Sequence, residues 1–338
     1  MKIGNSNTNN KVFIIAEIGN NHEGSFKLAK KLINEASATG VDAVKFQTFI
    51  PEQYVTTKNQ SRLTRLKKFQ LSFKQFKDLS LIAKKKGVIF FSTPFDIESA
   101  NFLNKIQPIF KISSGDNNFY PLIDTVANFG KPLIISTGGA DVKNIQKVYG
   151  KISKIWSKKN KNLKNLSFLH CVSSYPVPND QANLASIIYL KKLFPKIVIG
   201  YSDHTIGINA AALSVVAGAR IVEKHFTLDK NYSDFRDHQL SADPEEMFLM
   251  VKKIREAEKM LGKEEKKLQL CEKEMKVAGR RSIAAAHDLL PGTRLKKSDL
   301  IWVRPGEGFP PGNEKKIIGK KISRSLKMGE IIRKIDIK

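Results

Sequence analysis

The sequence predicts a (β/α)8 barrel followed by a small domain rich in β structure. Eight apolar segments alternate with eight amphipathic segments between residues 12 and 262, and this pattern stops after Gly262. Eight β–α units in about 250 residues are typical of a closed parallel barrel. A doubly wound sheet is the alternative, but its first strand should lead into a Gly-rich phosphate turn. GNNHEGS (19–25) does not have that pattern.

The expected strands are short, continuous apolar runs rich in Val, Ile and Phe. Such runs are typical of parallel strands that are covered on both faces. They lie at 12–19, 43–49, 88–93, 109–114, 132–138, 166–172, 197–204 and 220–226.

Helical periodicity fills the segments between these strands. Several of the expected helices end at a glycine, as at Gly40, Gly87 and Gly130, and Asp96 and Asp243 stand at N-cap positions. The expected helical segments are 25–40, 72–87, 96–106, 118–130, 141–152, 184–195, 207–219 and 243–262.

The C-terminal part has a different character. Residues 263–279 are highly charged and predict an extended or helical linker, whereas 280–338 contain short apolar runs and Pro-Gly turns without a long helical pattern. We therefore expect three parts: the barrel at 1–262, the linker at 263–279 and the small β-rich domain at 280–338.

Composition excludes several classes of protein. The net charge of +26 raises the question of nucleic acid, but the lysines are dispersed and no nucleic-acid-binding motif accompanies them. The N-terminal ten residues have no apolar core typical of a signal peptide, and the longest apolar stretch, near 210–219, is too short to cross a membrane. The two cysteines lack metal-ligand spacing, so Cys171 is expected to be a buried thiol. These features favour a cytoplasmic protein without nucleic-acid or membrane partners.

The carboxyl ends of the expected strands are unusually polar. In a barrel of this class the chemistry lies at that end. Lys45 and Lys111 stand inside apolar strands, where a lysine is costly unless it is paired or binds a ligand. The two lysines together predict a pocket for an anion.

Residues 200–207, GYSDHTIG, contain the residue types of a hydrolase triad. Because side chains alternate along a strand, Ser202 and His204 should share one face while Asp203 points to the other, which excludes a triad among them. His204 and His225 end consecutive strands that should lie about 4.8 Å apart, close enough to share a divalent ion. Buried structural histidines or substrate-binding histidines are the alternatives.

A series of motifs in chain order resembles the sialic acid synthase family. The tail RSIAAAHDLLPGTRLKKSDLIWVRPGEG resembles the antifreeze-like, β-clip domain that ends these enzymes. The motifs of the barrel are IIAEIGNNHEGS, VKFQTF, FSTPFD, FKISSGDNNFYPL, ISTGG, LHCVSSYPVP, GYSDHTIG and VEKHFTLDK.

The resemblance implies a metal-dependent condensation of phosphoenolpyruvate with an N-acetylated hexosamine. N-acetylmannosamine or a 2,4-diacetamido relative would be the acceptor, and a nine-carbon ulosonic acid and phosphate the products. It implies that His204 and His225 bind the metal, with Mn2+ expected first and Mg2+ or Co2+ as alternatives, and that Glu17 is the acid/base. The implied phosphoenolpyruvate residues are Lys45, Thr93, Lys111, Ser114, Ser173 and Ser202, and the implied sugar residues are Gln47, Asp116, Tyr175, Asp237 and Arg304.

Arg304 corresponds to an arginine that reaches the barrel of a second subunit in this family, so the resemblance implies a domain-swapped homodimer. From the sequence alone, Arg304 is an ordinary turn residue. The segment after the second strand and the FRDH stretch (235–238) depart from the family pattern, which leaves the acceptor sugar open. Two further alternatives are a related synthase of eight- or seven-carbon acids and a non-catalytic basic protein that binds polysaccharide or nucleic acid.

Overall fold

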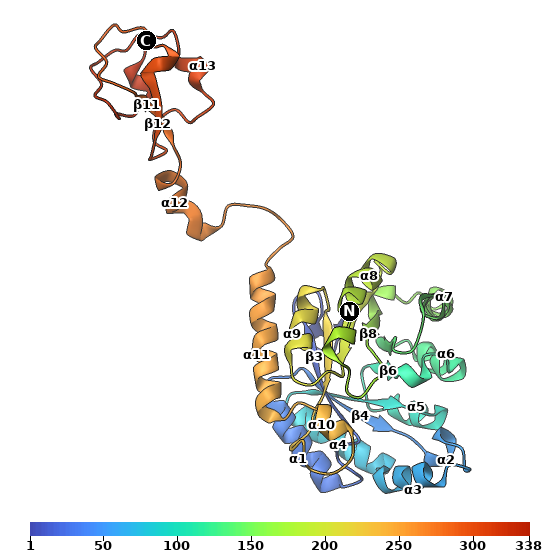
Figure 1. Ribbon diagram of the computed structural model, residues 1–338. Coiled ribbons are helices and arrows are strands. Elements are labelled where there is room, and N and C mark those ends of the chain that lie inside the picture. The colour runs from blue at the N-terminus through green and yellow to red at the C-terminus, as the bar shows by residue number, and fades with distance from the viewer. The chain divides into compact units, whose positions relative to one another are not determined.

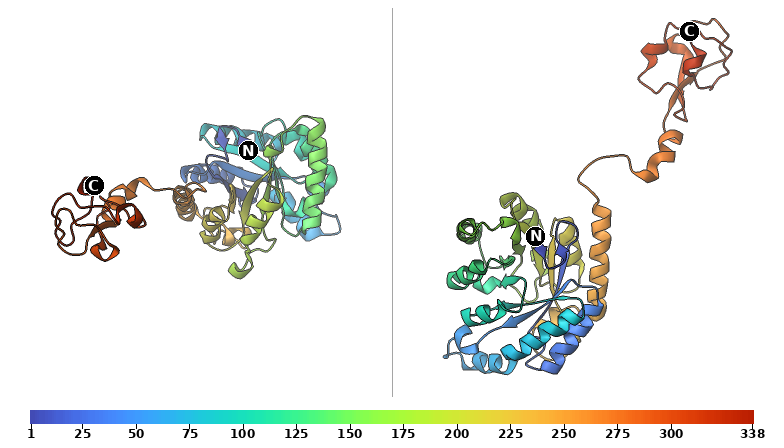
Figure 2. Two further views of the ribbon diagram at one scale, coloured as in Figure 1. Left: turned by 90° about the horizontal axis from the view of Figure 1, so that it is seen from above. Right: turned by 180° about the vertical axis from the view of Figure 1, so that it is seen from behind.

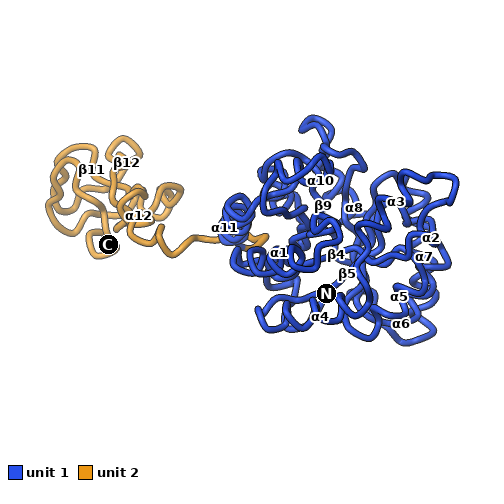
Figure 3. Tube along the Cα trace, turned by 90° about the horizontal axis from the view of Figure 1, so that it is seen from below, with its two compact units in different colours: residues 1–262 blue, residues 263–338 orange.

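Eight parallel strands form the central sheet of the N-terminal unit, and helices surround it (Figure 1, Figure 2). The computed structural model describes all residues from Met1 to Lys338 and divides into two compact units, Met1–Gly262 and Lys263–Lys338 (Figure 3). The strand order is β5-β4-β3-β10-β9-β8-β7-β6. The two end strands, β5 and β6, contact each other without forming a hydrogen-bonded ladder. The predicted (β/α)8 fold is therefore confirmed as a nearly closed barrel.

All eight barrel strands fall within one or two residues of segments predicted from the sequence, although several are shorter. Their bounds are β3 Phe13–Gly19, β4 Ala43–Thr48, β5 Ile89–Pro94, β6 Phe110–Ile112, β7 Leu133–Ser136, β8 Leu166–His170, β9 Val198–Asp203 and β10 Ile221–His225.

The eight covering helices also follow the predicted order. The side chains of Asp96 and Asp243 accept hydrogen bonds from the first turns of their helices, and Gly130 ends its helix in the left-handed region at φ 69°. The helices are α1 Phe26–Ala38, α4 Phe73–Lys85, α5 Ile97–Leu103, α6 Tyr120–Phe129, α7 Val142–Lys158, α8 Ala185–Leu193, α9 Asn209–Val216 and α11 Pro244–Leu261.

Alternation along the strands separates the helix-facing core from the interior of the barrel. In β3, Ile14 and Ala16 belong to the cluster that packs against the helices, whereas Phe13 and Ile15 belong to the inner cluster. The next inward position after Ile15 is Glu17. Three other inner apolar residues, Ala43, Ile109 and Ile221, are likewise followed two positions later by a buried charged side chain. The interior of the barrel is thus an apolar core toward the amino ends of the strands, and polar side chains gather at the carboxyl ends.

Two features of the N-terminal unit were absent from the prediction. The strands β1 (Lys2–Ile3) and β2 (Ser6–Asn7) form a short hairpin that places Met1 and Ile3 in the inner apolar cluster. The segment between β4 and α4 contains two additional helices, α2 (Pro51–Tyr54) and α3 (Gln60–Phe69). Helix α3 is held by Leu66 and Phe69, which pack in a small cluster with Phe49 and Phe95.

The second unit contains short elements around its own apolar core. It begins with the 3-10 turn η4 (Leu270–Glu272) and helix α12 (Lys273–Ala278), and its two strands, β11 (Ser282–Ala285) and β12 (Leu300–Val303), pair antiparallel. One further short helix is α13 (Glu314–Ile317). The core consists of Ile283, Ala285, Leu289, Leu295, Leu300, Ile317, Ile322, Leu326 and Ile332.

No helix of the structure combines the length and the apolar character needed to cross a bilayer. Cys171 is buried and Cys271 is exposed, and neither forms a disulfide.

Candidate active site

Four buried charged side chains form a network at the carboxyl end of the barrel. Lys45 Nζ lies 2.8 Å from Glu17 Oε2 and 3.6 Å from Glu223 Oε2. Lys111 Nζ lies 2.7 Å from Glu223 Oε1. Each side chain is at most 6% exposed. The two lysines that predicted an anion pocket are therefore both present in one cavity, where each is paired with a carboxylate.

Strand register brings these side chains together. Glu17 of β3 is aligned with Lys45 of β4 on one side and with His225 of β10 on the other. Glu223 of β10 is aligned with Ser202 of β9, which donates a hydrogen bond to Glu223 Oε1 at 3.0 Å. Neighbouring parallel strands thus present their inward side chains at one level, as a barrel requires.

The two carboxylates have opposite pKa shifts. Burial raises the pKa of Glu17 to about 7, against the influence of the Lys45 ammonium. Burial also disfavours ionisation of Glu223, but the ammonium groups of Lys111 and Lys45 together hold its pKa below the ordinary value. Glu223 is consequently a permanent anion, whereas Glu17 can gain or lose a proton near neutral pH.

Hydroxyl groups complete the wall of this inner cavity. Lys45 donates to Thr93 Oγ1 at 3.2 Å, and Ser114 Oγ lies 2.9 Å from Cys171 Sγ. Gly138 permits this arrangement, since a Cβ atom there would lie 2.7 Å from Ser114 Oγ and would also collide with Ser173 Oγ. The inner cavity has a volume of about 50 Å³.

His204 and His225 face each other across the same cavity, with ring centroids 5.6 Å apart. Nδ1 of His204 donates to the carbonyl of Val172 at 2.9 Å, which leaves the Nε2 lone pair free. Burial lowers the pKa of both rings, and Nδ1 of His225 is buried without a hydrogen-bond partner. Neutral imidazoles with free lone pairs fit a divalent transition-metal ion. No group of three or more His, Cys, Asp or Glu side chains is arranged so that it could hold one ion, so the other ligands would be water or substrate.

A second, outer cavity of about 330 Å³ shares part of its wall with the inner one. Tyr175 belongs to both walls, and its ring lies 4.3 Å from the ring of His204 and 4.7 Å from the guanidinium carbon of Arg236. The other shared residues are Gln47, Phe95, Ser113, Ser114 and His225. Together the two cavities form a site in which a small inner compartment opens into a larger one.

Most of the predicted site residues converge in this site. The residues Glu17, Lys45, Gln47, Thr93, Lys111, Ser114, Tyr175, Ser202, His204 and His225 line the inner cavity, and Ser173 and Asp237 line the outer one.

One predicted sugar-binding residue lines neither cavity, and another belongs to the second unit. Asp116 accepts a hydrogen bond from Ser113 at 2.8 Å and lines neither cavity. Arg304 belongs to the second unit, and its role stays a prediction.

Asp203 points away from the cavity, as the alternation of β9 requires. Its carboxylate lies 3.0 Å from Lys224 Nζ and accepts hydrogen bonds from the backbone and hydroxyl of Thr205. The exclusion of a Ser202–Asp203–His204 triad is therefore confirmed by the geometry.

The prediction missed several residues of the site. Glu223 was visible as a polar residue in an apolar strand, the same signal that identified the two lysines. Arg62 and Arg65 line the outer cavity from α3, in a segment whose contacts local sequence could not indicate. Asn20 joins the site through Gln47, which in turn donates to Glu17 Oε1 at 3.1 Å.

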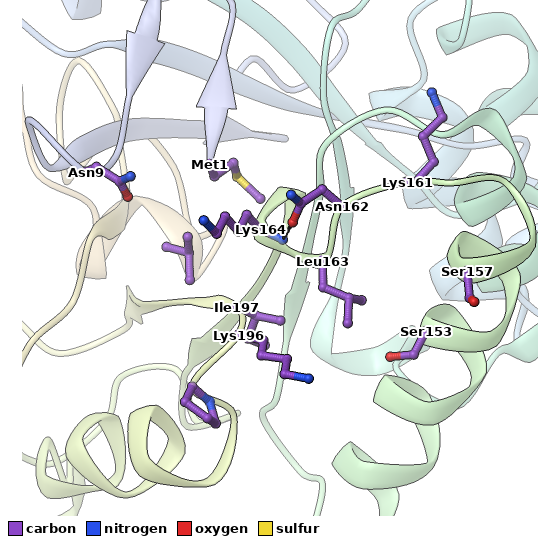
Figure 4. A pocket seen from close by; sticks show the side chains of 12 residues that line it. Met1, Asn9, Ser153, Ser157, Lys161, Asn162, Leu163, Lys164, Lys196 and Ile197 are labelled. Atoms are coloured by element: carbon purple, nitrogen blue, oxygen red, sulfur yellow. Dashed lines mark hydrogen bonds between the residues drawn. The ribbon is translucent and has the colours of Figure 1, made fainter.

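A further cavity of about 660 Å³ lies at the opposite end of the barrel. Figure 4 shows the side chains that line it. Its lining includes residues just before β8 and β9, such as Lys164 and Ile197, together with Met1. It contains no carboxylate and no histidine, so it lacks the acid–base and metal-binding groups found at the carboxyl end.

Comparisons with known proteins agree with this architecture. A profile of the NeuB family matches residues 32–266, and a SAF domain profile matches residues 280–338. The chain belongs to the NeuB family of sialic acid synthases.

Several proteins that are similar to nearly the whole chain are named as synthases. The N,N'-diacetyllegionaminic acid synthase of Campylobacter jejuni is 38% identical over 96% of this chain and 99% of its own length. The N-acetylneuraminate-9-phosphate synthase of Mus musculus is 34% identical over 92% of this chain and 88% of its own. The crystal structure of the N-acetylneuraminic acid synthetase of Leptospira borgpetersenii, in complex with citrate, has a TM-score of 0.75 and 35% identity. The similarity extends over 81% of this chain and 94% of the Leptospira chain.

Proposed function

We propose that this enzyme of the NeuB family condenses phosphoenolpyruvate with an N-acetylated hexosamine and water to give a nine-carbon ulosonic acid and phosphate. The observation that carries the proposal is the buried network of Glu17, Lys45, Lys111 and Glu223 opposite two neutral imidazoles. A non-catalytic binding role would leave Glu17, with its pKa of about 7, and the two neutral imidazoles without a function.

The inner compartment suits phosphoenolpyruvate, a small ligand with carboxylate and phosphate groups. Lys45 and Lys111 supply positive charge, and the hydroxyls of Thr93, Ser114 and Ser202 supply directed donors. Protonation of Glu17 leaves two ammonium groups opposed by Glu223 alone, which makes the compartment net positive for an anion.

The outer compartment has room for the open-chain sugar, with its aldehyde directed toward the inner one. C3 of phosphoenolpyruvate forms the new bond to the aldehyde carbon, whose oxygen takes up a proton. Water then adds at C2 and loses a proton, and the C2–O bond to phosphate breaks. Glu17 would give and accept these protons, because a carboxyl group with a pKa of about 7 is effective in both directions.

His204 and His225 would hold the divalent ion, most readily Mn2+. When bound, such an ion polarises a carbonyl oxygen as a Lewis acid. The ring orientation of His204 is fixed independently of any ion by its hydrogen bond to Val172 and by contact with Tyr175.

The direct test is an assay of inorganic phosphate released from phosphoenolpyruvate in the presence of Mn2+. The acceptor panel would contain N-acetylmannosamine, a 2,4-diacetamido-trideoxyhexose and phosphorylated five-carbon and four-carbon sugars. Release with an N-acetylated hexosamine is expected, and His204→Ala and His225→Ala should each abolish the metal-dependent rate. Release only with the shorter sugars would replace the proposal by an eight- or seven-carbon synthase, and no release at all would refute both.

We further propose a cytoplasmic homodimer in which Arg304 of one subunit completes the site of the other. Neither Glu17→Ala nor Arg304→Ala alone should be active. Mixed dimers of the two variants contain one site with both residues intact, so mixing should restore part of the activity. Mixed dimers without any recovered activity would contradict the exchange.

A further inference from the structure

A buried ion pair stands in the apolar layer between the barrel and its helices. Lys224 Nζ of β10 lies 3.0 Å from Asp203 Oδ2 of β9, and the two side chains are 1% and 0% exposed. The nearest positions on the same face of the two strands, Tyr201, Val222 and Phe226, all belong to the helix-facing apolar core. Taking two charges out of water is costly, and well-packed apolar residues often stabilise such a position equally well. Stability alone therefore does not account for the pair.

The ion pair holds the backbone on both sides of His204. Asp203 Oδ1 accepts hydrogen bonds from the backbone amide and the hydroxyl of Thr205 at 2.9 and 2.8 Å. Lys224 donates a further hydrogen bond to the carbonyl of Thr205. Asp203 and Thr205 flank His204 in the chain, and Lys224 directly precedes His225. The network thus connects the two candidate metal ligands through the residues next to them.

This connection stands where the regular pairing of the two strands stops. The aligned pairs of β9 and β10 end with Asp203 opposite Lys224, so His204 is the first residue of its segment beyond them. The side-chain network continues the link between the two segments as far as Thr205. On its other side, His204 is held to the segment after β8, because its carbonyl accepts from Val177 N at 2.9 Å.

The ring of His225 makes this link important for metal binding. Its Nδ1 atom is buried without a hydrogen-bond partner, whereas the ring of His204 is oriented by the carbonyl of Val172. The position of the His225 ring therefore depends on its backbone and on packing. Imidazole nitrogens bind a divalent ion over a narrow range of distance, about 2.0–2.1 Å for zinc. A small shift of one backbone segment against the other would take one ring out of that range.

We propose that Asp203 and Lys224 are positioning residues, which fix the spacing of His204 and His225 for a divalent metal ion. This inference rests on the proposed function, in which the two histidines hold that ion. Neither Asp203 nor Lys224 lines the inner cavity, so both act through the backbone and not by contact with substrate. With two histidines as the ligands from the protein, the affinity for the ion depends on both rings being held in place beforehand.

The experiment measures Mn2+ binding to the full-length protein without substrates, by isothermal titration calorimetry after treatment with a chelator. His204→Ala and His225→Ala should each abolish saturable binding, which identifies the site. The double variant Asp203→Leu with Lys224→Met replaces the ion pair by apolar side chains, a change that buried pairs often tolerate. It should raise the Kd for Mn2+ by about tenfold or more.

A kinetic measurement separates metal positioning from general damage to the site. Ser202 and Glu223 lie within the aligned pairs of β9 and β10, and both line the inner cavity. In the double variant, KM for phosphoenolpyruvate at saturating Mn2+ should therefore stay unchanged, whereas the Mn2+ concentration that gives half-maximal phosphate release should rise with the Kd.

A second variant and a control accompany the double variant. Thr205→Val keeps the shape of the side chain but removes the hydroxyl that Asp203 accepts from, so it should raise the Kd for Mn2+ by a smaller factor. It decides the question if the double variant does not fold. Lys230→Met with Glu246→Gln removes a second ion pair whose charges act on Lys224, but neither residue forms a hydrogen bond to residues 203–205. This control should leave the Kd unchanged.

Three results would overturn the inference. These are an unchanged Kd for Mn2+ in the folded double variant, or in Thr205→Val if that variant does not fold; an equal rise of the Kd in the control; and no saturable Mn2+ binding by the unaltered protein. A lower melting temperature without weaker Mn2+ binding falls under the first of these, since it would make the pair merely structural. Failure of the proposed function has a different signature, namely no phosphate release by the unaltered protein with any acceptor. Mn2+ binding that depends on the ion pair would support the positioning role in that case as well.

Discussion

Replacing Glu223 by Gln should strongly destabilise the barrel. Glu223 is 5% exposed and is shared by Lys111 and Lys45, at 2.7 Å and 3.6 Å. The amide keeps the shape of the side chain but leaves Lys111 as a buried cation without an anionic partner. Removing one member of a buried ion pair costs about 3–5 kcal/mol. For a unit of this size, each kcal/mol shifts the melting temperature by about 2–4 °C, so a fall of about 6–20 °C is expected.

A double-mutant cycle separates the charge effect from general damage. Lys111→Met alone should also destabilise, because it leaves Glu223 with only the more distant Lys45. The double variant Glu223→Gln with Lys111→Met removes both charges, so its loss should fall short of the sum of the single losses by about 1–3 kcal/mol. Urea unfolding of the four proteins, followed by circular dichroism at constant pH and salt, measures this coupling.

The pair Glu52–Lys67 provides the control for this cycle. Its two charged atoms are also 2.7 Å apart, but its side chains are 50% and 54% exposed. Solvent screens such a pair, so the same cycle there should show little coupling. Additive losses at Glu223 and Lys111, or equal coupling in the two cycles, would refute the reasoning that burial makes the inner network energetically important.

Three other predictions concern single positions. Gly138→Ala should raise KM for phosphoenolpyruvate, because the added Cβ atom would displace Ser114. A Cβ atom at Gly150 would have nothing within 4 Å, so Gly150→Ala is the control and should leave the kinetics unchanged. Equal effects of the two variants in the phosphate-release assay would contradict this. Burial lowers the pKa of His22 to about 3, so below pH about 6.5 the unfolded chain binds a proton that the folded chain does not. This residue should lower the free energy of unfolding by at most about 1.4 kcal/mol for each pH unit toward acid. In urea titrations at several pH values, the free energy of unfolding of His22→Gln should therefore depend less steeply on pH. The raised pKa of Glu17 predicts a break near pH 7 in the pH profile of the phosphate-release rate of the unaltered enzyme, and a profile without a break there would contradict this role.

The sequence by itself determined the barrel and the side of each strand that faces the cavity. Apolar runs separated by helical periodicity depend only on neighbours along the chain, and so does the alternation that placed Ser202 and His204 inward and Asp203 outward. A lysine in an apolar strand also needs no tertiary information to be recognised as unusual. This local logic identified Lys45, Lys111 and the pair of histidines as residues of one site.

Only the tertiary structure decided which side chains meet. Lys111 on β6 and Glu223 on β10 come from strands that are not neighbours in the sheet, and their contact exists because the barrel curves around a common centre. Arg62 and Arg65 reach the outer cavity because α3 packs through Leu66 and Phe69. Such contacts depend on closure and packing over long separations in the chain, which local patterns do not encode. The outer cavity therefore emerged from the structure, whereas the barrel and its inner polar ring followed from the sequence.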